Sequence, residues 1–493
     1  MLKKLMALLL AGAVCMGVLA ACAKEDGNDG GTTASGTVQS DMMTSGTETL
    51  SPHEQVFEEE DFGGADFKTL YRTTGVNEYY FEYIWSEGFT GDAVGEAVRK
   101  RNDLVEDKYN VTITSERCNS PMEEASVRMQ SGQVDFNLIY DLVPNMRDAA
   151  LDGKLYDVHK LDYVNLDKSY WVPNAVDGLT IGGKMFVFTN MVSANSVSWT
   201  KLYLFNKNLM DKYGITYPYE YVDEGNWTYD VLLEMITKAE DDVDGDGVIG
   251  EADVQGGISG EEILAGACYE PLCDIVDGEY KFIGRTEGMT AAYNKYRYRC
   301  GEVSYFDVED YYLHGSTAHP MAPYMHIARG IGFGEDHMLF LSGTLDMTKE
   351  FSEMESDYGI APVPVRNAGD EYRTAAYYGV PMFAIPADVA DPDMTALVIE
   401  YMAYESERLL LPAVYETTIM TKRVHDDRDL AMIDIVRNSV KYDWAEIYLA
   451  DASEYSSMRL RRFNGNFGSV VVKFFPRIQK EIDAVVTKVG SIG

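Results

Sequence analysis

Apolar and polar positions follow two different periods between residues 60 and 142, which predicts strands and helices in turn. The expected elements are a strand at 66–72, a helix at 92–109, a strand at 111–114, a helix near 121–131 and a buried strand at 136–142. The helix repeats apolar side chains at the i, i+3, i+4 spacing of an amphipathic helix. Strands that alternate with helices are typical of a mostly parallel sheet, in which ligands bind at the carboxyl ends of the strands. Asp141, near the end of the last strand, is therefore a candidate ligand-binding residue.

The N-terminus carries an almost unbroken apolar run from Leu5 to Ala21, preceded by Lys3 and Lys4. Its length suits the core of a signal peptide and is short for a membrane-spanning helix. The run ends in Leu19-Ala20-Ala21-Cys22, which resembles a bacterial lipobox. The resemblance implies removal of residues 1–21, a diacylglycerol on the thiol of Cys22, and a place on the outer face of the cytoplasmic membrane. An ordinary signal peptide with an accidental cysteine and an uncleaved membrane helix are the alternatives.

Residues 22–55 are expected to form a flexible linker between the lipid and a globular part. They are rich in Gly, Ser, Thr and Asp and hold few large apolar side chains. Such a segment cannot bury enough apolar surface to offset the entropy lost on ordering.

Composition limits the architecture and the partners. A chain of 493 residues is too long for one hydrophobic core, so two lobes or more are expected. The net charge of −38 argues against binding to nucleic acid or to anionic lipid surfaces. The 34 Tyr and 5 Trp fit saccharide binding, because aromatic faces stack on sugar rings, although most tyrosines are expected to be packing residues.

The cysteines allow several states. After loss of the signal peptide and lipidation of Cys22, there remain Cys118, Cys268, Cys273 and Cys300, and export permits disulfides. Cys268 and Cys273 are close enough in sequence to pair, but the sequence does not decide this.

Residues 242–253 match the calcium-loop pattern D-x-D-x-D-G with an acidic residue at position twelve. The expected ligands are the carboxylates of Asp242, Asp244, Asp246 and Asp253 and the carbonyl oxygen of Val248. Position twelve holds Asp rather than the longer Glu, so bidentate contact there is left open. A structural calcium ion is expected, and an acidic surface turn that binds nothing is the alternative.

No motif for catalysis is present. The chain has no HExxH, no P-loop, no CxxC pair and no G-x-S-x-G elbow. A pair of opposed carboxylates of the glycosidase type cannot be judged from spacing among 80 acidic residues. A non-enzymatic protein is expected, with a surface carbohydrate-active enzyme or adhesin as the less favoured reading.

Seven short segments between about residue 60 and the end share a pattern with a known family. They are residues 90–111, 131–136, 153–157, 183–186, 204–207, 227–230 and 358–364. In these segments, and in their order, the chain resembles the extracellular solute-binding proteins of family 1. The chain departs from the family where Asn190 or Met191 stands near a usual Pro, and where Gly225-Asn226 precedes Trp227.

The resemblance implies a type II periplasmic-binding-protein-like α/β fold: two α/β lobes, joined by a hinge, with a ligand cleft between them. One lobe would comprise residues 56–192 and about 366–440, and the other 199–362 with the C-terminal helices and the calcium loop. It also implies a monomer that captures a saccharide and delivers it to an ABC import permease. A non-sugar solute is the alternative ligand.

Five positions are expected to hold the ligand through aromatic faces and polar groups. Trp199 follows the first hinge, and Tyr377 and Tyr378 follow the second, just before the strand 382–385. Asp141 ends a strand, and Tyr80, with its neighbour Tyr79, follows the first strand and would line the rim.

Overall fold

The computed structural model describes residues 57–72, 84, 93–193, 195–250, 252–258, 260–283, 286–299, 332–351, 354–376, 381–420, 427–449 and 467–493. These belong to one of the chain's two units, Phe57–Gly493; the other is Met1–Val56. The predicted signal peptide, the lipidated Cys22 and the linker therefore lie outside the described residues.

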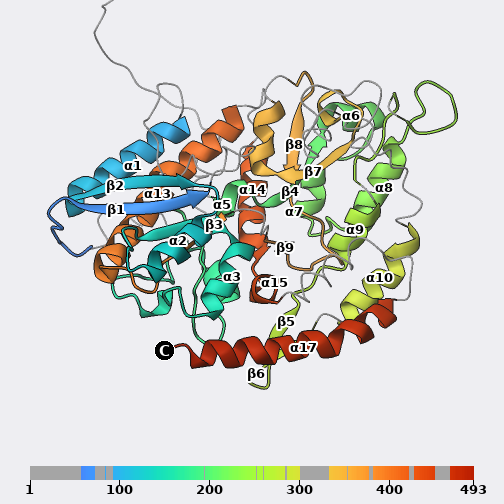
Figure 1. Ribbon diagram of the computed structural model, residues 1–493. Helices are drawn as coiled ribbons and strands as arrows, with labels where there is room; N and C mark the ends of the chain where they lie inside the picture. The colour runs from blue at the N-terminus through green and yellow to red at the C-terminus, as the bar shows by residue number, and fades with distance from the viewer. Residues whose placement is uncertain are drawn as a thin grey trace, which may run out of the picture. The chain divides into compact units, whose positions relative to one another are not determined.

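Strands and helices alternate over residues 65–151, and beyond them several helices or several strands follow one another (Figure 1). The strands are β1 (Ala65–Arg72), β2 (Val111–Cys118), β3 (Leu138–Leu142), β4 (Lys201–Asn206), β5 (Cys273–Val276), β6 (Glu279–Phe282), β7 (Phe340–Thr344), β8 (Tyr358–Ala361), β9 (Thr374–Ala375), β10 (Pro381–Ala384) and β11 (Val440–Lys441). The α-helices are α1 (Ala93–Tyr109), α2 (Pro121–Gln130), α3 (Val143–Leu151), α4 (Pro173–Leu179), α5 (Asn195–Ser198), α6 (Lys207–Tyr213), α7 (Pro218–Asp223), α8 (Tyr229–Ala239), α9 (Gly260–Ala267), α10 (Glu287–Arg299), α13 (Pro392–Met420), α14 (Asp427–Ser439), α15 (Trp444–Tyr448) and α17 (Phe467–Ser491). Short 3₁₀ helices are η2 (Val158–Lys160), η3 (Ser169–Trp171) and η4 (Leu345–Phe351).

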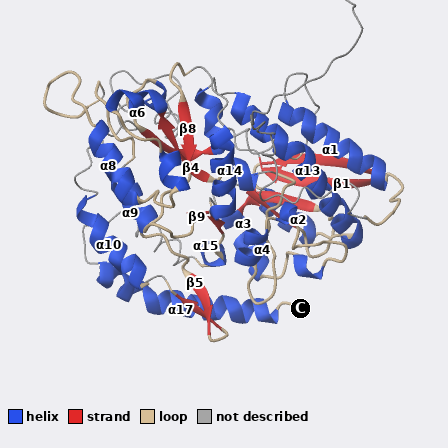
Figure 2. Cartoon of the chain, turned by 180° about the vertical axis from the view of Figure 1, so that it is seen from behind, coloured by secondary structure: helices blue, strands red, loops and turns tan. Residues whose placement is uncertain are grey.

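The first sheet has the strand order β10-β3-β1-β2. β1 is parallel to both β2 and β3, whereas β10 joins β3 antiparallel. α1 and α13 cover one face and α2 and α3 the other (Figures 1 and 2). The predicted strand–helix order of residues 66–142 is confirmed, with β2 running four residues beyond the expected end at Thr114.

Apolar side chains fix α13 against α1. Val94 and Val98 of α1 form a buried cluster with Leu410 and Val414 of α13. Arg101, also fully buried, donates to the carbonyl of Val192 at 2.7 Å and to Ser406 Oγ at 3.2 Å. Segments far apart in the sequence therefore meet around α1. Because Arg101 is desolvated there, the pKa of its guanidinium is lowered to about 9.

The second sheet has the order β7-β4-β8, with β4 antiparallel to both neighbours (Figure 2). α14 packs on this sheet, because the buried carboxylate of Asp429 accepts from Ile360 N at 2.7 Å and from Tyr219 Oη at 2.6 Å. Residues 427–439 thus lie against the second sheet, although the sequence placed them with the first lobe. The lobe boundaries themselves stay predictions.

The last helix, α17, contacts the β5–β6 hairpin and the end of α3. Gln479 accepts from Phe282 N at 3.0 Å, and its amide donates to Tyr280 O at 3.1 Å, which fixes the β5–β6 hairpin. Lys488 pairs with Asp152, at the end of α3, at 2.7 Å.

The β5–β6 hairpin turns at Asp277 and Gly278, whose φ values of 55° and 81° suit a two-residue turn.

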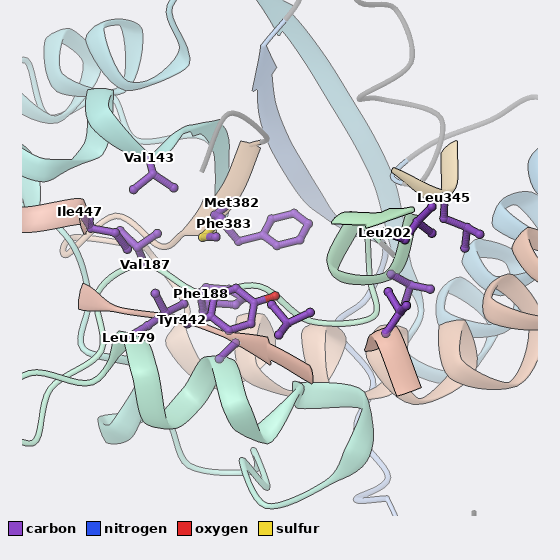
Figure 3. Close-up of a cluster of buried hydrophobic side chains, with 14 of the residues drawn as sticks. Val143, Leu179, Val187, Phe188, Leu202, Leu345, Met382, Phe383, Tyr442 and Ile447 are labelled. Atoms are coloured by element: carbon purple, nitrogen blue, oxygen red, sulfur yellow. The ribbon is translucent and has the colours of Figure 1, made fainter. Parts of the chain in front are cut away.

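One buried core contains residues from both the first sheet and the second sheet (Figure 3). Phe188 and Phe383 stack at a ring distance of 5.6 Å, and Leu202 lies beside Leu345. The described cysteines Cys118, Cys268 and Cys273 are in no disulfide, so Cys268 and Cys273 are not paired with each other in this structure.

Candidate functional site

The parallel strands of the first sheet end at one edge. Arg72 of β1 is opposite Cys118 of β2, and Tyr71 is opposite Tyr140 of β3, so Arg72 is level with Asp141. β10 begins at the same edge, since Pro381 is opposite Leu142. We call these ends the first-sheet edge, where an α/β sheet offers its binding positions.

Asp141 is fully buried in the first-sheet edge and accepts four hydrogen bonds. Oδ1 accepts from Arg72 Nη1 at 3.1 Å, Leu142 N at 2.7 Å and Asn145 Nδ2 at 2.9 Å. Oδ2 accepts from Met122 N, near the start of α2, at 3.1 Å. The carboxylate therefore ties two strands and two helix starts together, which is a structural task in addition to the ligand contact expected from the sequence.

The second sheet presents an edge of its own, formed by the start of β4 and the ends of β7 and β8. Lys201 is opposite Thr344, and Tyr203 is opposite Ala361. We call this the second-sheet edge. Trp199 lies two residues before β4, is partly buried against the core, and donates its backbone N–H to Asn195 O at 3.1 Å.

A buried contact links α5, the short helix before β4, to β3. Asn195, which is 2% exposed, donates from its side-chain amide to the hydroxyl of Tyr140, the residue before Asp141. Trp199 is thus held one helical turn away from a residue that touches the first-sheet edge. The other expected ligand residues, Tyr79, Tyr80, Tyr377 and Tyr378, lie outside the described residues.

Lys201 was not singled out by the sequence analysis, yet it is the exposed residue at the second-sheet edge. Its side chain makes no hydrogen bond or ion pair within the described part of the chain. Surrounding protein nevertheless lowers its pKa by desolvation, against the opposing field of Glu262 on α9. The sequence did contain a signal for Lys201. It lies two positions after Trp199, the predicted stacking residue, and at the first position of a strand.

A cavity of about 250 Å³ lies along the segment that follows β8. Arg366 forms one wall, paired with Glu270 at 2.9 Å and donating to Ala267 O at 2.9 Å. The buried Tyr229 forms another, and its hydroxyl has no hydrogen-bond partner among the described residues. The cavity has room for a few water molecules or one small polar solute, and none of the expected ligand residues lines it.

The predicted calcium loop brings its first three carboxylates together. One oxygen each of Asp242, Asp244 and Asp246 lies within 4.8 Å of the others, and all three side chains are exposed. Asp242 also accepts from the backbone of Gly245 and Gly247, both at 2.8 Å. Gly247 has φ 85°, so glycine at position six permits the turn that the carboxylates need.

Asp253 closes the loop from position twelve. It is 1% exposed and accepts from Val243 N and Gly250 N, both at 2.7 Å. These backbone donors, Gly250 first, lower its pKa, so it is ionised at neutral pH. The donor set of clustered carboxylates on a glycine turn fits a hard cation such as Ca²⁺.

Two of the described thiols, Cys118 and Cys273, do not resemble nucleophiles. Burial raises the pKa of Cys118, at the first-sheet edge, to about 11, and it raises the pKa of Cys273 as well. Both are neutral at pH 7, whereas a catalytic cysteine needs a lowered pKa.

No family model matches the chain, and no curated protein matches it. Solved structures do match the chain. The galacto-N-biose-/lacto-N-biose I-binding protein of an ABC transporter from Bifidobacterium longum, in complex with lacto-N-biose, matches with a TM-score of 0.50 and 13% identity. The match covers 87% of this chain and 99% of that protein.

The chain has a periplasmic-binding-protein-like fold. The expected fold class, with its two α/β regions, is confirmed by this likeness and by the two sheets.

The periplasmic-binding-protein-like fold does not by itself decide between binding and catalysis. A de novo designed cysteine esterase matches with a TM-score of 0.52 and 12% identity, over 86% of this chain and 99% of the other. A second designed esterase matches with 0.51 and 13%, over the same shares. Within the described residues, no helix has the length and apolarity to cross a membrane.

Proposed function

We propose that this chain is an extracytoplasmic solute-binding lipoprotein, which captures a saccharide and delivers it to an ABC import permease. The observation that carries the proposal is the fold shared with a lacto-N-biose-binding protein of an ABC transporter over 87% of the chain. The hydrogen bond between Asn195 and Tyr140 supports it, because it ties the helix that precedes Trp199 to the strand that ends in Asp141. These groups supply a stacking face and polar partners for hydroxyls.

A calorimetric screen tests this function. The mature protein is titrated with maltose, lactose, lacto-N-biose and cellobiose, and with their longer homologues. We expect binding of at least one saccharide, with the sugar recovered intact, as a binding protein leaves its ligand unchanged. Cleavage of the bound sugar would instead favour the carbohydrate-active enzyme, and binding of non-sugar solutes alone would favour the alternative ligand class.

The N-terminal sequence gives a separate prediction for attachment. We expect Cys22→Ala to abolish incorporation of labelled lipid and to move the protein from the membrane to the soluble fraction, because the thiol is the acceptor of the diacylglycerol. Cys15→Ala, within the same apolar run, is the matched control and should remain membrane-bound. Lipid labelling that persists in Cys22→Ala would contradict the lipoprotein assignment.

The loop 242–253 is proposed to hold a structural calcium ion. Asp242, Asp244 and Asp246 would supply carboxylate oxygens, with Val248 O and Asp253 completing the set. The bound ion would neutralise their mutual repulsion and fix the loop at its base, where Asp241 and Val254 are paired.

We also propose that the protein acts as a monomer.

A further inference from the structure

The cavity that follows β8 is enclosed by three parts of the chain: the start of α8, the end of α9 and residues 364–373. Val365 fixes the last of these to α8. Its N–H donates to Trp227 O at 2.9 Å, and its carbonyl accepts from Tyr229 N at 3.2 Å. The cavity therefore lies between segments that backbone hydrogen bonds hold in place.

Arg366 forms a fixed wall of this cavity. Its Nε donates to Ala267 O at 2.9 Å, its Nη2 to Tyr269 O at 3.3 Å, and its Nη1 to Glu270 Oε1 at 2.9 Å. The guanidinium thus closes the C-terminal end of α9, where the last carbonyl groups of a helix need donors. A Cβ atom on Gly288 would lie 2.5 Å from Nη1, so glycine at this position of α10 leaves room for the arginine.

The hydroxyl of Tyr229 is buried at this cavity without a partner. The side chain is 1% exposed, and its Oη makes no hydrogen bond within the described part of the chain. A Cβ atom on Gly266 would lie 2.0 Å from Oη, so glycine at this position of α9 leaves space for the hydroxyl. Both residues line the cavity. Because a buried hydroxyl without a partner costs free energy, we expect a bound molecule to supply the partner.

The size of the cavity suits more than one ordered water. A buried water needs about 10–15 Å³ of such space. The cavity has about 250 Å³. Pockets for drug-sized ligands begin at about 300 Å³, so this cavity fits a smaller organic molecule.

The charged groups that line the cavity already have partners. Arg366 pairs with Glu270, and Arg373 lies 3.5 Å from Glu371. Asp370 accepts two hydrogen bonds from the residue three positions before it. A charged ligand would compete with one of these pairs, whereas hydroxyl groups can both donate and accept beside them. The lining therefore favours an uncharged molecule with several hydroxyl groups.

We propose that this cavity is a second binding site, which takes one small uncharged polyol with a hydroxyl group hydrogen-bonded to Tyr229 Oη. Neither Trp199 nor Asp141 lines it. The site is thus separate from the residues expected to hold the saccharide, and it goes beyond the proposed function.

Saturation-transfer NMR on the full mature protein, with xylitol as the probe, tests this site. It measures direct contact, which is needed because polyols also stabilise proteins from whose surface they are excluded. We expect Tyr229→Phe, which keeps the ring and removes the hydroxyl, to weaken xylitol binding at least about fivefold. Without polyol its melting temperature should not fall, because the lost hydroxyl has no partner within the described residues. Tyr163→Phe, at a tyrosine that is 49% exposed, is the matched control and should bind as the parent does.

Gly266→Ala tests the same place from α9. Its methyl group would occupy the space of the Tyr229 hydroxyl, so we expect it to lose the xylitol signal. Gly490→Ala, at a glycine of α17 with open space around it, is the control for a helix glycine and should keep the signal.

Parental xylitol affinity in a folded Tyr229→Phe variant would overturn the site. So would a parent that shows no saturation transfer to xylitol, erythritol or glycerol, because the cavity would then hold water alone. Tighter binding of xylonate than of xylitol would overturn the uncharged class. Tyr229→Phe should bind the saccharide of the screen as the parent does, and loss of both ligands would show that the cavity is part of the saccharide site. A parent that binds xylitol but no saccharide contradicts the proposed function and leaves this site standing.

Discussion

Replacement of Asp141 by alanine lowers the free energy of unfolding by about 3–5 kcal/mol, because it leaves a buried ion pair broken. Asp141 is fully buried, and its partner Arg72 is 20% exposed. The substitution also removes the acceptor of Met122 N, Leu142 N and Asn145 Nδ2. Buried donors without an acceptor cost free energy in addition to the lost pair.

Urea unfolding followed by circular dichroism measures this change, and Asp148→Ala is its control. Asp148 forms a 3.0 Å ion pair with Arg147 on α3, but its side chain is 79% exposed, so its loss costs less than about 1 kcal/mol. A cost of Asp141→Ala that equals the control would show that the first-sheet edge does not depend on this carboxylate. A folded variant with weaker saccharide binding would support the ligand contact predicted from the sequence.

Addition of millimolar calcium to chelator-treated protein raises the melting temperature. A ligand bound only by the folded state adds about 2.7 kcal/mol of stability at a concentration of 100 times its dissociation constant. We expect the largest rise in the parent and little in the double variant Asp242→Asn/Asp246→Asn, which keeps the shape of the loop but removes two charged ligands. Differential scanning calorimetry with and without calcium measures both.

The control for charge is Asp388→Asn, an exposed carboxylate outside the loop. It should keep the full response to calcium. A melting temperature that calcium leaves unchanged in the parent would contradict the ion site. An equal rise in the double variant would place the ion elsewhere on the protein.

Short-range patterns in the sequence were enough to predict the first sheet's core strands and their helices. β1, α1, α2 and β3 begin and end within a few residues of the expected positions, because apolar period and capping act locally. Thr228 caps α8 as expected, accepting from Val231 N at 3.4 Å. The calcium loop could likewise be recognised, since its carboxylates converge through one glycine turn within twelve residues.

The candidate binding site could be predicted only in part. Trp199 and Asp141 were chosen by their places after a hinge and at a strand end, but Lys201, Tyr229 and Arg366 were not. Arg366 pairs with Glu270, which is 96 residues away and shares no motif with it, so no local pattern indicates this pair. Similarly, nothing local shows that Asp141 is engaged by Arg72, which is 69 residues away.

By itself, the sequence determined the alternation of strands and helices over residues 65–151 and the carboxylate loop, and it carries the lipobox prediction, since each depends on neighbours within about twenty residues. Only the tertiary structure decided that β10 joins β3, that α14 lies on the second sheet through Asp429, and that Asn195 reaches Tyr140. These pairings join residues 55 to 245 positions apart. Their stability comes from burial and hydrogen bonds that exist only after the chain has folded, so no local pattern encodes them.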